Sequence, residues 1–466
     1  MIFKRRLAAA MAGLAVTAGS VAAVGLPATS AHAATTTTSV TLPISTYSHM
    51  VLDPAHQHIF ISSAASNTIL VTDYSGNTVA TIANEPGADG LALSSDGSTV
   101  YAALSTGDAI SAISTSSLAE TARYATGTGT DPAYVAYTSG KVWFGYGLTP
   151  QAGIGSIDPS TSPATVTLNA TNDPWSAWYS APMLAASPNG ELVAGQPGLD
   201  PITLGSYDVS SGSAITLAAP RAFFPPYAET DNLHDLQITP DGKDVVVASG
   251  YPYYQQVFQV SDLSLVGKYT TGSYPGAVSI ASDGTVAAGI YSGTGSDEVF
   301  LFAPGGSTPL NSYGFGYYTE VATDGLAITP DASKLFAITN SSYDFTASPV
   351  LNIVTDPVQG ASTLSMTGPA SDNKDGAITL TGTLGGASPY AGGQALQVTR
   401  IDPTNPDGVA LADVTTNADG SFTVTDTPPK ANVDSATVTY QVSYAGDAHL
   451  TASSASVSVT VHYNAS

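Results

Sequence analysis

The chain has 466 residues, no cysteine, and 36 acidic against 12 basic residues, which gives a formal net charge of −24. A charge this negative repels phosphate backbones and anionic lipid headgroups, so it argues against nucleic-acid partners and against binding to a membrane surface. Without cysteine the chain has no disulfide, no thiolate chemistry and no lipidated N-terminal cysteine, so its stability has to come from the size of its cores.

The first 33 residues have the pattern of a secretory signal peptide. Lys4–Arg6 supply a positive segment, residues 7–26 an apolar segment, and Ala31–Ala33 a cleavage site of small residues. The apolar segment is short and rich in alanine and glycine, which favours cleavage over a membrane anchor. We therefore expect residues 1–33 to be a signal peptide, residues 34–38 to be a Thr-rich linker, and the mature protein to be secreted. Association with the cell wall stays open.

Seven copies of one unit follow between His49 and Pro357, each with a short apolar strand, a tight polar turn and a second apolar strand. The turns are DPAHQH (53–58), SSDGST (94–99), TSGK (138–141), SPNGE (187–191), TPDGK (239–243), ASDGT (281–285) and TPDASK (329–334). Equivalent turn residues are separated by 41, 43, 50, 52, 42 and 48 residues. β-type repeats of this length are typical of propellers and related arrays.

The second unit shows the strand pattern most clearly. GLALS (90–94), TVYAAL (99–104), AISAIS (109–114) and AETARYAT (119–126) read as four successive strands. Four strands repeated seven times predict an all-β, seven-bladed β-propeller over residues 39–357.

The last unit is one strand short. Its three strands are 324–329, 334–339 and 349–354, whereas SVTLPIS (39–45) is left over before the first unit. An open ring would expose two long sheet edges, so we expect residues 39–45 to close the propeller as the outer strand of the seventh blade.

The stretches TILVTDYSGNTVATIA and SSDGSTVYAA resemble the YVTN-type β-propeller repeat family. The resemblance covers about residues 45–357 and implies the propeller fold. That family includes surface-layer, periplasmic and lactonase-like members, so the resemblance by itself leaves the function open. The middle units depart from the family pattern through long insertions.

From Val358 onward the repeat stops, and seven short alternating strands follow with turn signals between them. This pattern predicts an immunoglobulin-type β-sandwich over residues 358–466. TTNADGSFTV and YQVSYAGDAHLTASSASVSVTV look like bacterial Ig-like repeat domains of secreted proteins, which implies a spacer or adhesive module.

Aromatic residues gather in the links that should all lie on one face of the propeller. Loops that expose flat rings usually bind something, because ordering them costs entropy. The rings can stack on sugars or anchor a protein, while the alternative is that they pack on one another and fix the long loops. The candidate ligand-binding residues are Trp175, Trp178, Tyr179, Phe224, Tyr227, Tyr253, Tyr254, Tyr317 and Tyr318.

A second candidate site lies near the propeller axis. Aligning the units on their turns brings Asp89, His234 and Asp324 to one position just before the inner strand, and Asp131 and His49 fall within one residue of it. Carboxylate and imidazole groups converging from several blades could hold Ca²⁺ or Mg²⁺. The alternative is a set of polar plugs bonded to backbone amides and channel water.

The sequence therefore predicts a secreted binding protein that contacts a cell-wall or extracellular glycan, or a surface protein, through the aromatic insertions. The rival prediction is a lactonase-like or carbohydrate-active hydrolase or lyase with a divalent metal at the channel mouth. A purely structural envelope scaffold is the third possibility. Neither a GxSxG nucleophile motif nor an HExxH zinc motif occurs, so no catalytic residue is assigned.

Overall fold

The computed structural model describes residues 36–174, 176–223, 229–291, 297–373, 376–386 and 389–463. The predicted signal peptide lies outside the described residues. Within these ranges the chain is almost entirely β-structure, with one 3₁₀ turn, η1 (Ser105–Gly107).

The described residues between Thr36 and Thr355 form seven four-stranded antiparallel sheets, numbered here in chain order. Sheet 1 contains β2 (His49–Asp53), β3 (His58–Ser63), β4 (Thr68–Asp73) and β5 (Thr78–Ala83), and sheet 2 contains β6 (Ala88–Leu93), β7 (Thr99–Leu104), β8 (Ala109–Ser114) and β9 (Ala119–Ala125). Sheet 3 contains β10 (Tyr134–Thr138), β11 (Lys141–Tyr146), β12 (Gly153–Asp158) and β13 (Thr165–Thr167). Sheet 4 contains β14 (Met183–Ala186), β15 (Glu191–Gly195), β16 (Thr203–Asp208) and β17 (Ile215–Ala222).

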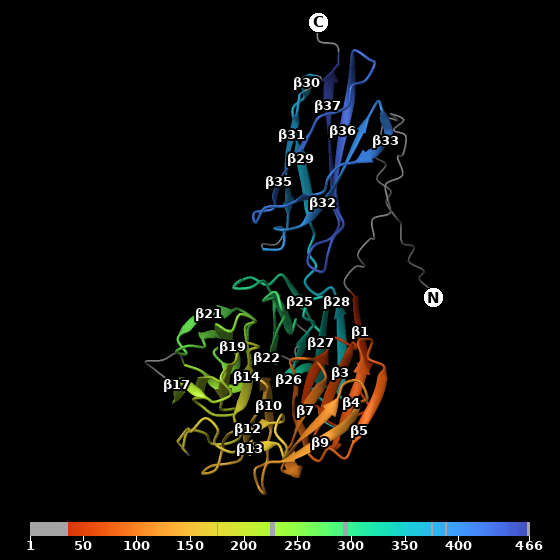
Figure 1. Cartoon of the computed structure of the whole chain (residues 1–466). Coiled ribbons are helices and arrows are strands. Elements are labelled where there is room, and N and C mark those ends of the chain that lie inside the picture. The colour runs from red at the N-terminus through yellow and green to blue at the C-terminus, as the bar shows by residue number, and fades with distance from the viewer. Residues whose placement is uncertain are drawn as a thin grey trace, which may run out of the picture.

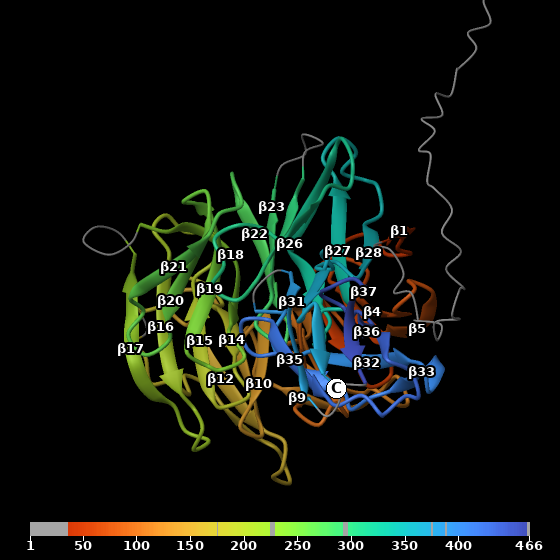
Figure 2. The same ribbon diagram turned by 90° about the horizontal axis from the view of Figure 1, so that it is seen from above.

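Sheet 5 contains β18 (Asp231–Ile238), β19 (Asp244–Tyr251), β20 (Gln255–Gln259) and β21 (Leu265–Tyr269). Sheet 6 contains β22 (Pro275–Ile280), β23 (Val286–Ile290), β24 (Val299–Phe302) and β25 (Asn311–Tyr313). Sheet 7 contains β26 (Thr319–Ile328), β27 (Lys334–Ser341), β28 (Val350–Thr355) and β1 (Thr36–Thr41). Figure 2 shows the outer strands β5, β17 and β21 at the periphery and β18, β22 and β26 nearer the middle. The arrangement is that of propeller blades.

Burial explains why the strands of one sheet differ in sequence. In sheet 2 the second strand, β7, is apolar along nearly its whole length because neighbouring sheets cover both of its faces. The outer strand, β9, has exposed and half-buried residues throughout and carries charged side chains. Continuous apolar runs therefore mark the middle strands, and polar alternation marks the outer ones.

The N-terminal strand closes the ring. β1 pairs antiparallel with β28, from Thr36 opposite Thr355 to Thr41 opposite Val350. The Ser39 hydroxyl also donates a hydrogen bond to the Asn352 side chain, 2.6 Å away. The predicted closure is confirmed, although the strand begins at Thr36, inside the predicted linker, and ends at Thr41.

The C-terminal part is a two-sheet sandwich at one end of the molecule (Figure 1). One sheet has the order β29-β31-β35 and the other β30-β37-β36-β32-β33, with β34 also paired to β32. The strands are β29 (Thr363–Thr367), β30 (Ser371–Asn373), β31 (Ile378–Gly385), β32 (Ala395–Asp402), β33 (Asn405–Ala410), β34 (Val414–Thr415), β35 (Ser421–Asp426), β36 (Ser435–Tyr444) and β37 (Ser453–His462). Apolar residues of both sheets share one core.

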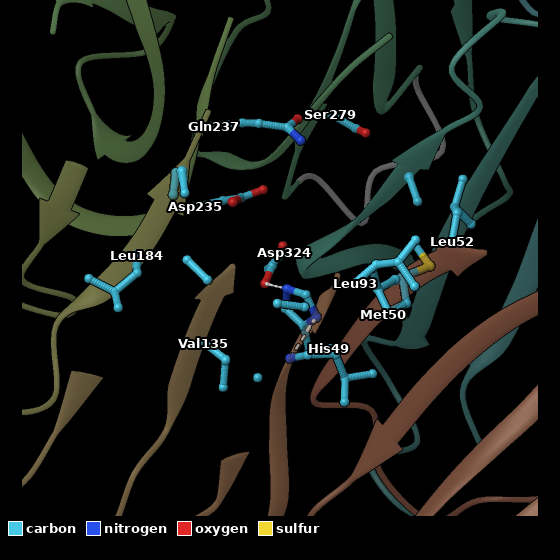
Figure 3. A pocket seen from close by; sticks show the side chains of 18 of the residues that line it. His49, Met50, Leu52, Leu93, Val135, Leu184, Asp235, Gln237, Ser279 and Asp324 are labelled. Atoms are coloured by element: carbon cyan, nitrogen blue, oxygen red, sulfur yellow. Dashed lines mark hydrogen bonds and ion pairs between the residues drawn. The ribbon is translucent and has the colours of Figure 1, made fainter. Parts of the chain in front are cut away.

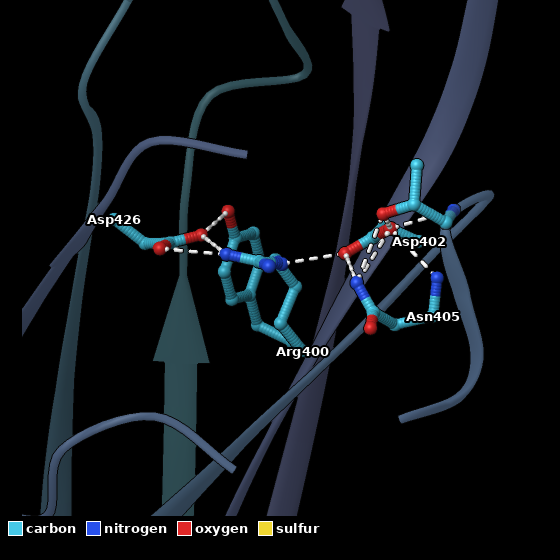
Figure 4. Close-up of polar contacts among 6 residues, drawn as sticks. Arg400, Asp402, Asn405 and Asp426 are labelled. Carbon is cyan, nitrogen blue, oxygen red and sulfur yellow. Dashed lines mark hydrogen bonds and ion pairs between the residues drawn. The ribbon is translucent and has the colours of Figure 1, made fainter. Parts of the chain in front are cut away.

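A buried ion-pair network fixes one end of this sandwich (Figure 4). Arg400 donates to Asp402 at 2.7 Å and to both carboxylate oxygens of Asp426 at 2.9 Å, and Tyr440 donates to Asp426 at 2.8 Å. Burial raises the pKa of Asp402, but hydrogen bonds from Thr404, Arg400 and Asn405 outweigh it and lower the pKa to about 2. Every charge in the network therefore has a partner, as burial requires.

The sandwich docks on the turn between β22 and β23. His449 contacts the Asp283 carboxylate at 2.9 Å, and the Tyr390 and Thr285 hydroxyls lie 2.5 Å apart. The Tyr390 and His449 rings stack at 4.0 Å between centroids. Because this turn joins the first and second strands of sheet 6, the sandwich contacts the face opposite the links that join one sheet to the next.

Candidate functional site

Sheet topology sorts the connecting links onto two faces. Neighbouring strands run antiparallel, so the links from second to third strand and from one sheet to the next leave the same face. We call this the aromatic face, because eight exposed aromatic rings of sheets 5 to 7 lie on these links or beside them. The eight residues, here called the aromatic arc, are Tyr251, Tyr253, Tyr274, Tyr291, Tyr317, Tyr318, Tyr343 and Phe345, with between 43% and 85% of their surface exposed.

Direct contacts join the rings of sheet 5. The Tyr253 ring lies 5.9 Å from Tyr251 and 5.3 Å from Tyr274 between centroids, in edge-to-face arrangements. A hydrogen bond with the Tyr274 hydroxyl raises the pKa of Tyr253. The Tyr291 backbone N–H then donates to the Tyr274 carbonyl oxygen at 2.9 Å, which carries the arc into sheet 6.

A second group of rings belongs to sheet 7. The Tyr318 ring lies 6.5 Å from Tyr317 and 5.9 Å from Tyr343. Tyr291 also hydrogen-bonds Glu320 on β26, which raises the pKa of Tyr291 and links the two groups of rings. The arc thus crosses three consecutive sheets as a discontinuous row of tilted, exposed rings.

The arc contains only part of the predicted ligand-binding set. Tyr253, Tyr317 and Tyr318 belong to it, whereas Tyr179 is exposed on the link into sheet 4. Tyr254 is half-buried, with the Lys268 ammonium 4.8 Å from its ring centre. Trp175, Phe224 and Tyr227 lie outside the described residues.

The expectation for Trp178 needs correction, because its ring is only 1% exposed. The indole N–H donates to Asp173 at 3.2 Å, and Tyr207 and Thr171 donate to the same carboxylate oxygen, each at 2.7 Å. Trp178 therefore belongs to the core between sheets 3 and 4 and offers no ring to a ligand.

The inner strands of all seven sheets surround an axial cavity of about 420 Å³. In each sheet the inner strand starts on the aromatic face, so the first lining residue of each strand marks the mouth on that side. These first residues include His49, Tyr134, Asp235 and Asp324. Figure 3 shows His49, Asp235 and Asp324 reaching the same cavity from separate elements. The three residues His49, Asp235 and Asp324 are called the axial cluster below.

Hydrogen bonds fix the geometry of the axial cluster. His49 Nε2 lies 3.0 Å from Asp324 Oδ2, and His49 Nδ1 lies 3.3 Å from the Leu91 backbone nitrogen. Because Nδ1 accepts from the backbone, Nε2 carries the proton that faces Asp324. Asp235 is 5% exposed, and its Oδ2 accepts from the Val278 N–H at 2.6 Å.

The two carboxyl groups interact electrostatically. Burial raises the pKa of Asp235 well above its usual range, and the charge of Asp324 together with a side-chain hydrogen bond between the two residues raises it further. Burial lowers the pKa of His49, but Asp324 outweighs this effect and the net shift is upward. The mouth can therefore hold a neutral carboxyl group, an acceptor carboxylate and an imidazole N–H side by side.

The four residues predicted to bind a metal do not form one group. Asp324 lines the channel, and burial raises the pKa of the nearby Asp89 to about 6. His234 instead bonds the Pro275 carbonyl oxygen and the Asn232 amide, and Asp131 is exposed. In the part of the chain that the structure describes, no three His, Asp or Glu side chains are arranged to hold a metal ion. These residues do not fit a Ca²⁺ or Mg²⁺ site.

Asp235 is the site residue that sequence reasoning missed. The pairing of β18 with β19 shifts register between Leu233 and Asp235, so the alignment of turns selected His234 although its neighbour faces the lumen. The sequence signal was present as an acidic residue beside His234 in a predicted inner strand. A β-bulge cannot be predicted from one sequence, because it changes the side of the sheet on which a side chain lies while the hydrophobic pattern stays almost the same.

No protein-family model and no curated protein matches the chain. Among solved structures, the β-propeller domain of Cps50 (Swd1) from Myceliophteria thermophila is similar, with a TM-score of 0.50 and 11% identity over 68% of this chain and 98% of that one. PorZ is described as an essential surface component of the type-IX secretion system of Porphyromonas gingivalis. It has a TM-score of 0.49 and 14% sequence identity, over 87% of this chain and 58% of that one. The gluconolactonase XC5397 of Xanthomonas campestris has a TM-score of 0.38 and 14% sequence identity, over 67% of this chain and 86% of that one.

The similarity to the Cps50 domain shows the fold alone: this chain contains a β-propeller. In the described ranges, no helix has the length and apolar character needed to cross a bilayer.

Proposed function

We propose that this protein is a secreted binding protein, built as a seven-bladed β-propeller with an immunoglobulin-type C-terminal module, that holds an extracellular glycan on its aromatic face. One observation carries the proposal: eight exposed aromatic rings gather on one face of three neighbouring sheets. Rings scattered singly on a surface need no explanation, but many rings gathered on one face indicate a binding surface.

A glycan fits this surface better than a flat apolar partner. Tilted rings offer apolar faces to the C–H side of a sugar, while their hydroxyls and Glu320 can bond sugar hydroxyls. A surface protein anchored on the same rings is the second partner that the test must separate. The predicted association with the cell envelope belongs to this proposal.

Binding to arrays of glycans and of surface proteins tests the proposal. We expect Tyr253→Ala and Tyr318→Ala each to weaken glycan binding about tenfold, since a ring that anchors a ligand contributes more than about 1 kcal/mol. Leu265→Ala is the matched control, because Leu265 is an exposed apolar side chain on the outer strand β21. Glycan binding that survives both tyrosine substitutions overturns the proposal, and binding to proteins alone replaces the glycan with a protein partner.

The alternative of a metal-assisted hydrolase or lyase requires a metal at the channel mouth. The metal content of the purified protein and its thermal midpoint with and without Ca²⁺ or Mg²⁺ decide it. A bound divalent ion lost in Asp89→Ala would revive this alternative, and no metal effect on the thermal midpoint would remove it.

A further inference from the structure

We propose that the ligand of the aromatic face is a glycan bearing free amino groups, and that the axial cluster is the subsite that takes one ammonium group. This inference rests on the proposed function and specifies its ligand. Three features carry it. The arc lies beside strands that form the channel mouth; among the described residues, those lining the channel include carboxyl groups and no basic residue other than His49; and one buried acceptor lining it has no hydrogen-bond partner within that part of the chain.

The arc and the mouth form one surface. Glu320, which bonds Tyr291, lies on β26, the strand that carries Asp324 into the channel. A Cβ built on Gly276 would lie 4.0 Å from both the Tyr291 Cβ and the His234 Nδ1, so the arc passes close to β18 at the residue that precedes Asp235. A sugar stacked near Tyr291 can therefore extend a substituent into the cavity.

The mouth has an excess of carboxyl groups. Asp235 and Asp324 line the cavity, Asp89 lies close enough for its pKa to respond to His49 and Asp324, and no lysine or arginine is among the lining residues. Burial and the neighbouring Asp324 raise the pKa of Asp235, which favours its protonated form. A bound cation would replace that proton and allow both carboxyl groups to ionise.

An ammonium group matches the acceptors present. It donates up to three hydrogen bonds, and the carboxyl oxygens of Asp235 and Asp324 can accept two of them. Farther along the channel, beside Ser279 in Figure 3, Gln237 has a buried Oε1 without a hydrogen-bond partner among the described residues. The same cavity is also lined by apolar side chains, including Leu93 and Leu184 (Figure 3), which suit the carbon frame of a sugar. A divalent ion would need a larger set of closely spaced oxygens than the described residues provide.

Calorimetric titration with three oligosaccharides of equal length tests the inference: glucosamine, N-acetylglucosamine and glucose oligomers. At about pH 6 a free amine is protonated, so we expect the glucosamine oligomer to bind about tenfold more tightly than the other two oligomers. Asp324→Asn should reduce that preference to about that of the neutral oligomers while leaving their affinity unchanged. Asparagine suits this position because Asp324 has a φ of +54°, which asparagine tolerates.

Proton release gives an independent readout. When the ammonium group displaces the proton of Asp235, titrations in two buffers with different ionisation enthalpies should show protons released by the wild type and none by Asp235→Asn. Circular dichroism checks that both variants are folded. If Asp324→Asn is not folded, Asp235→Asn alone is used to test the ammonium subsite.

The outcomes separate the two proposals. Equal affinities for the three oligomers, or a preference that both asparagine variants keep, overturns the ammonium subsite and leaves the glycan-binding function standing. No binding of any oligomer by folded wild-type protein argues against both. A thermal midpoint raised by Ca²⁺ alone, without amine preference, assigns the axial cluster to a metal instead.

Discussion

At the scale of single residues, the channel mouth shows how a fold can maintain an unfavourable arrangement. Asp235 accepts a hydrogen bond from the Val278 N–H in a buried position, and burial together with Asp324 raises its pKa. Turn alignment predicted that Asp324 lies at the mouth. Turn alignment could not place Asp235 at the mouth, because the register shift between Leu233 and Asp235 changes which of the neighbouring side chains points into the channel.

Replacing Asp235 with asparagine should stabilise the protein as pH rises. A carboxyl group whose folded-state pKa is raised binds its proton more tightly when folded, so its stabilisation is complete below the unfolded value of about 3.9 and is lost as pH rises toward the folded value. Asp235→Asn removes that loss. Free energies of unfolding from urea titrations at pH 4, 5.5 and 7 should therefore show a difference between variant and wild type that grows with pH.

Asp413→Asn is the matched control, because it makes the same change at an exposed carboxylate. A constant difference for Asp235→Asn across the three pH values would contradict the raised pKa of Asp235.

Trp178 and Tyr179 are neighbours with opposite roles, which substitution should reveal. Trp178→Ala should cost about 3–5 kcal/mol, because it opens a cavity and removes one donor from the buried Asp173. Tyr179→Ala should change the free energy of unfolding by no more than about 0.5 kcal/mol, since that side chain is 59% exposed. Urea denaturation of both variants measures the contrast, and equal costs would show that the burial of Trp178 is misassigned.

At the scale of secondary-structure elements, hydrophobic pattern was sufficient wherever a strand is regular. In sheet 2, β7 and β8 have the bounds that the sequence predicts, because polar turns end both strands. The pattern was insufficient at the channel mouth, where β6, β18, β22 and β26 all carry register irregularities. β1 shows a third case, since its threonine-rich start has no apolar signal but pairs along its length with β28.

Removing β1 should destabilise the ring. Deletion of residues 34–46 exposes the edge of β28 and removes Leu42 and Ile44 from the core, so the thermal midpoint should fall on the order of 10 °C. A chain that starts at Ala34 is the control and retains the whole strand. Differential scanning calorimetry compares the two, and equal midpoints would show that closure by β1 contributes little.

At the scale of the whole molecule, the docked sandwich leaves the aromatic face uncovered. It contacts the turn between β22 and β23, while the arc lies on links of the other face. Ala303 packs into the sandwich core, and Leu310 packs on both that core and the core between sheets 6 and 7. The sequence predicted two domains but not their contact, because Asp283 lies in a turn motif that recurs in most repeats without a partner from outside.

His449→Ala should uncouple the two parts during unfolding. The contact of His449 with Asp283 and its stacking on Tyr390 join them, so their loss should convert a shared calorimetric transition into two, with the sandwich unfolding first. His462→Ala, an exposed histidine of the same sandwich, should leave the transition unchanged. Unaltered unfolding of His449→Ala would show that the parts are coupled elsewhere.

Acid should weaken the same contact. Burial raises the pKa of Asp283, but hydrogen bonds from His449 and Thr285 outweigh it and lower the pKa. The stabilisation is therefore present above the unfolded value of about 3.9 and is lost as pH falls through the lower folded value.

The pairing of β1 with β28 also sets an order of events during biosynthesis. Thr36 is among the first described residues to be made, yet its partner Thr355 follows only after all the intervening sheets. Until then the nascent chain carries an incomplete ring whose first and last sheet edges are unpaired and open to other chains. A ribosome that stalls before Val350 would thus release an aggregation-prone fragment, whereas the few residues from Val350 to Thr355 complete the ring.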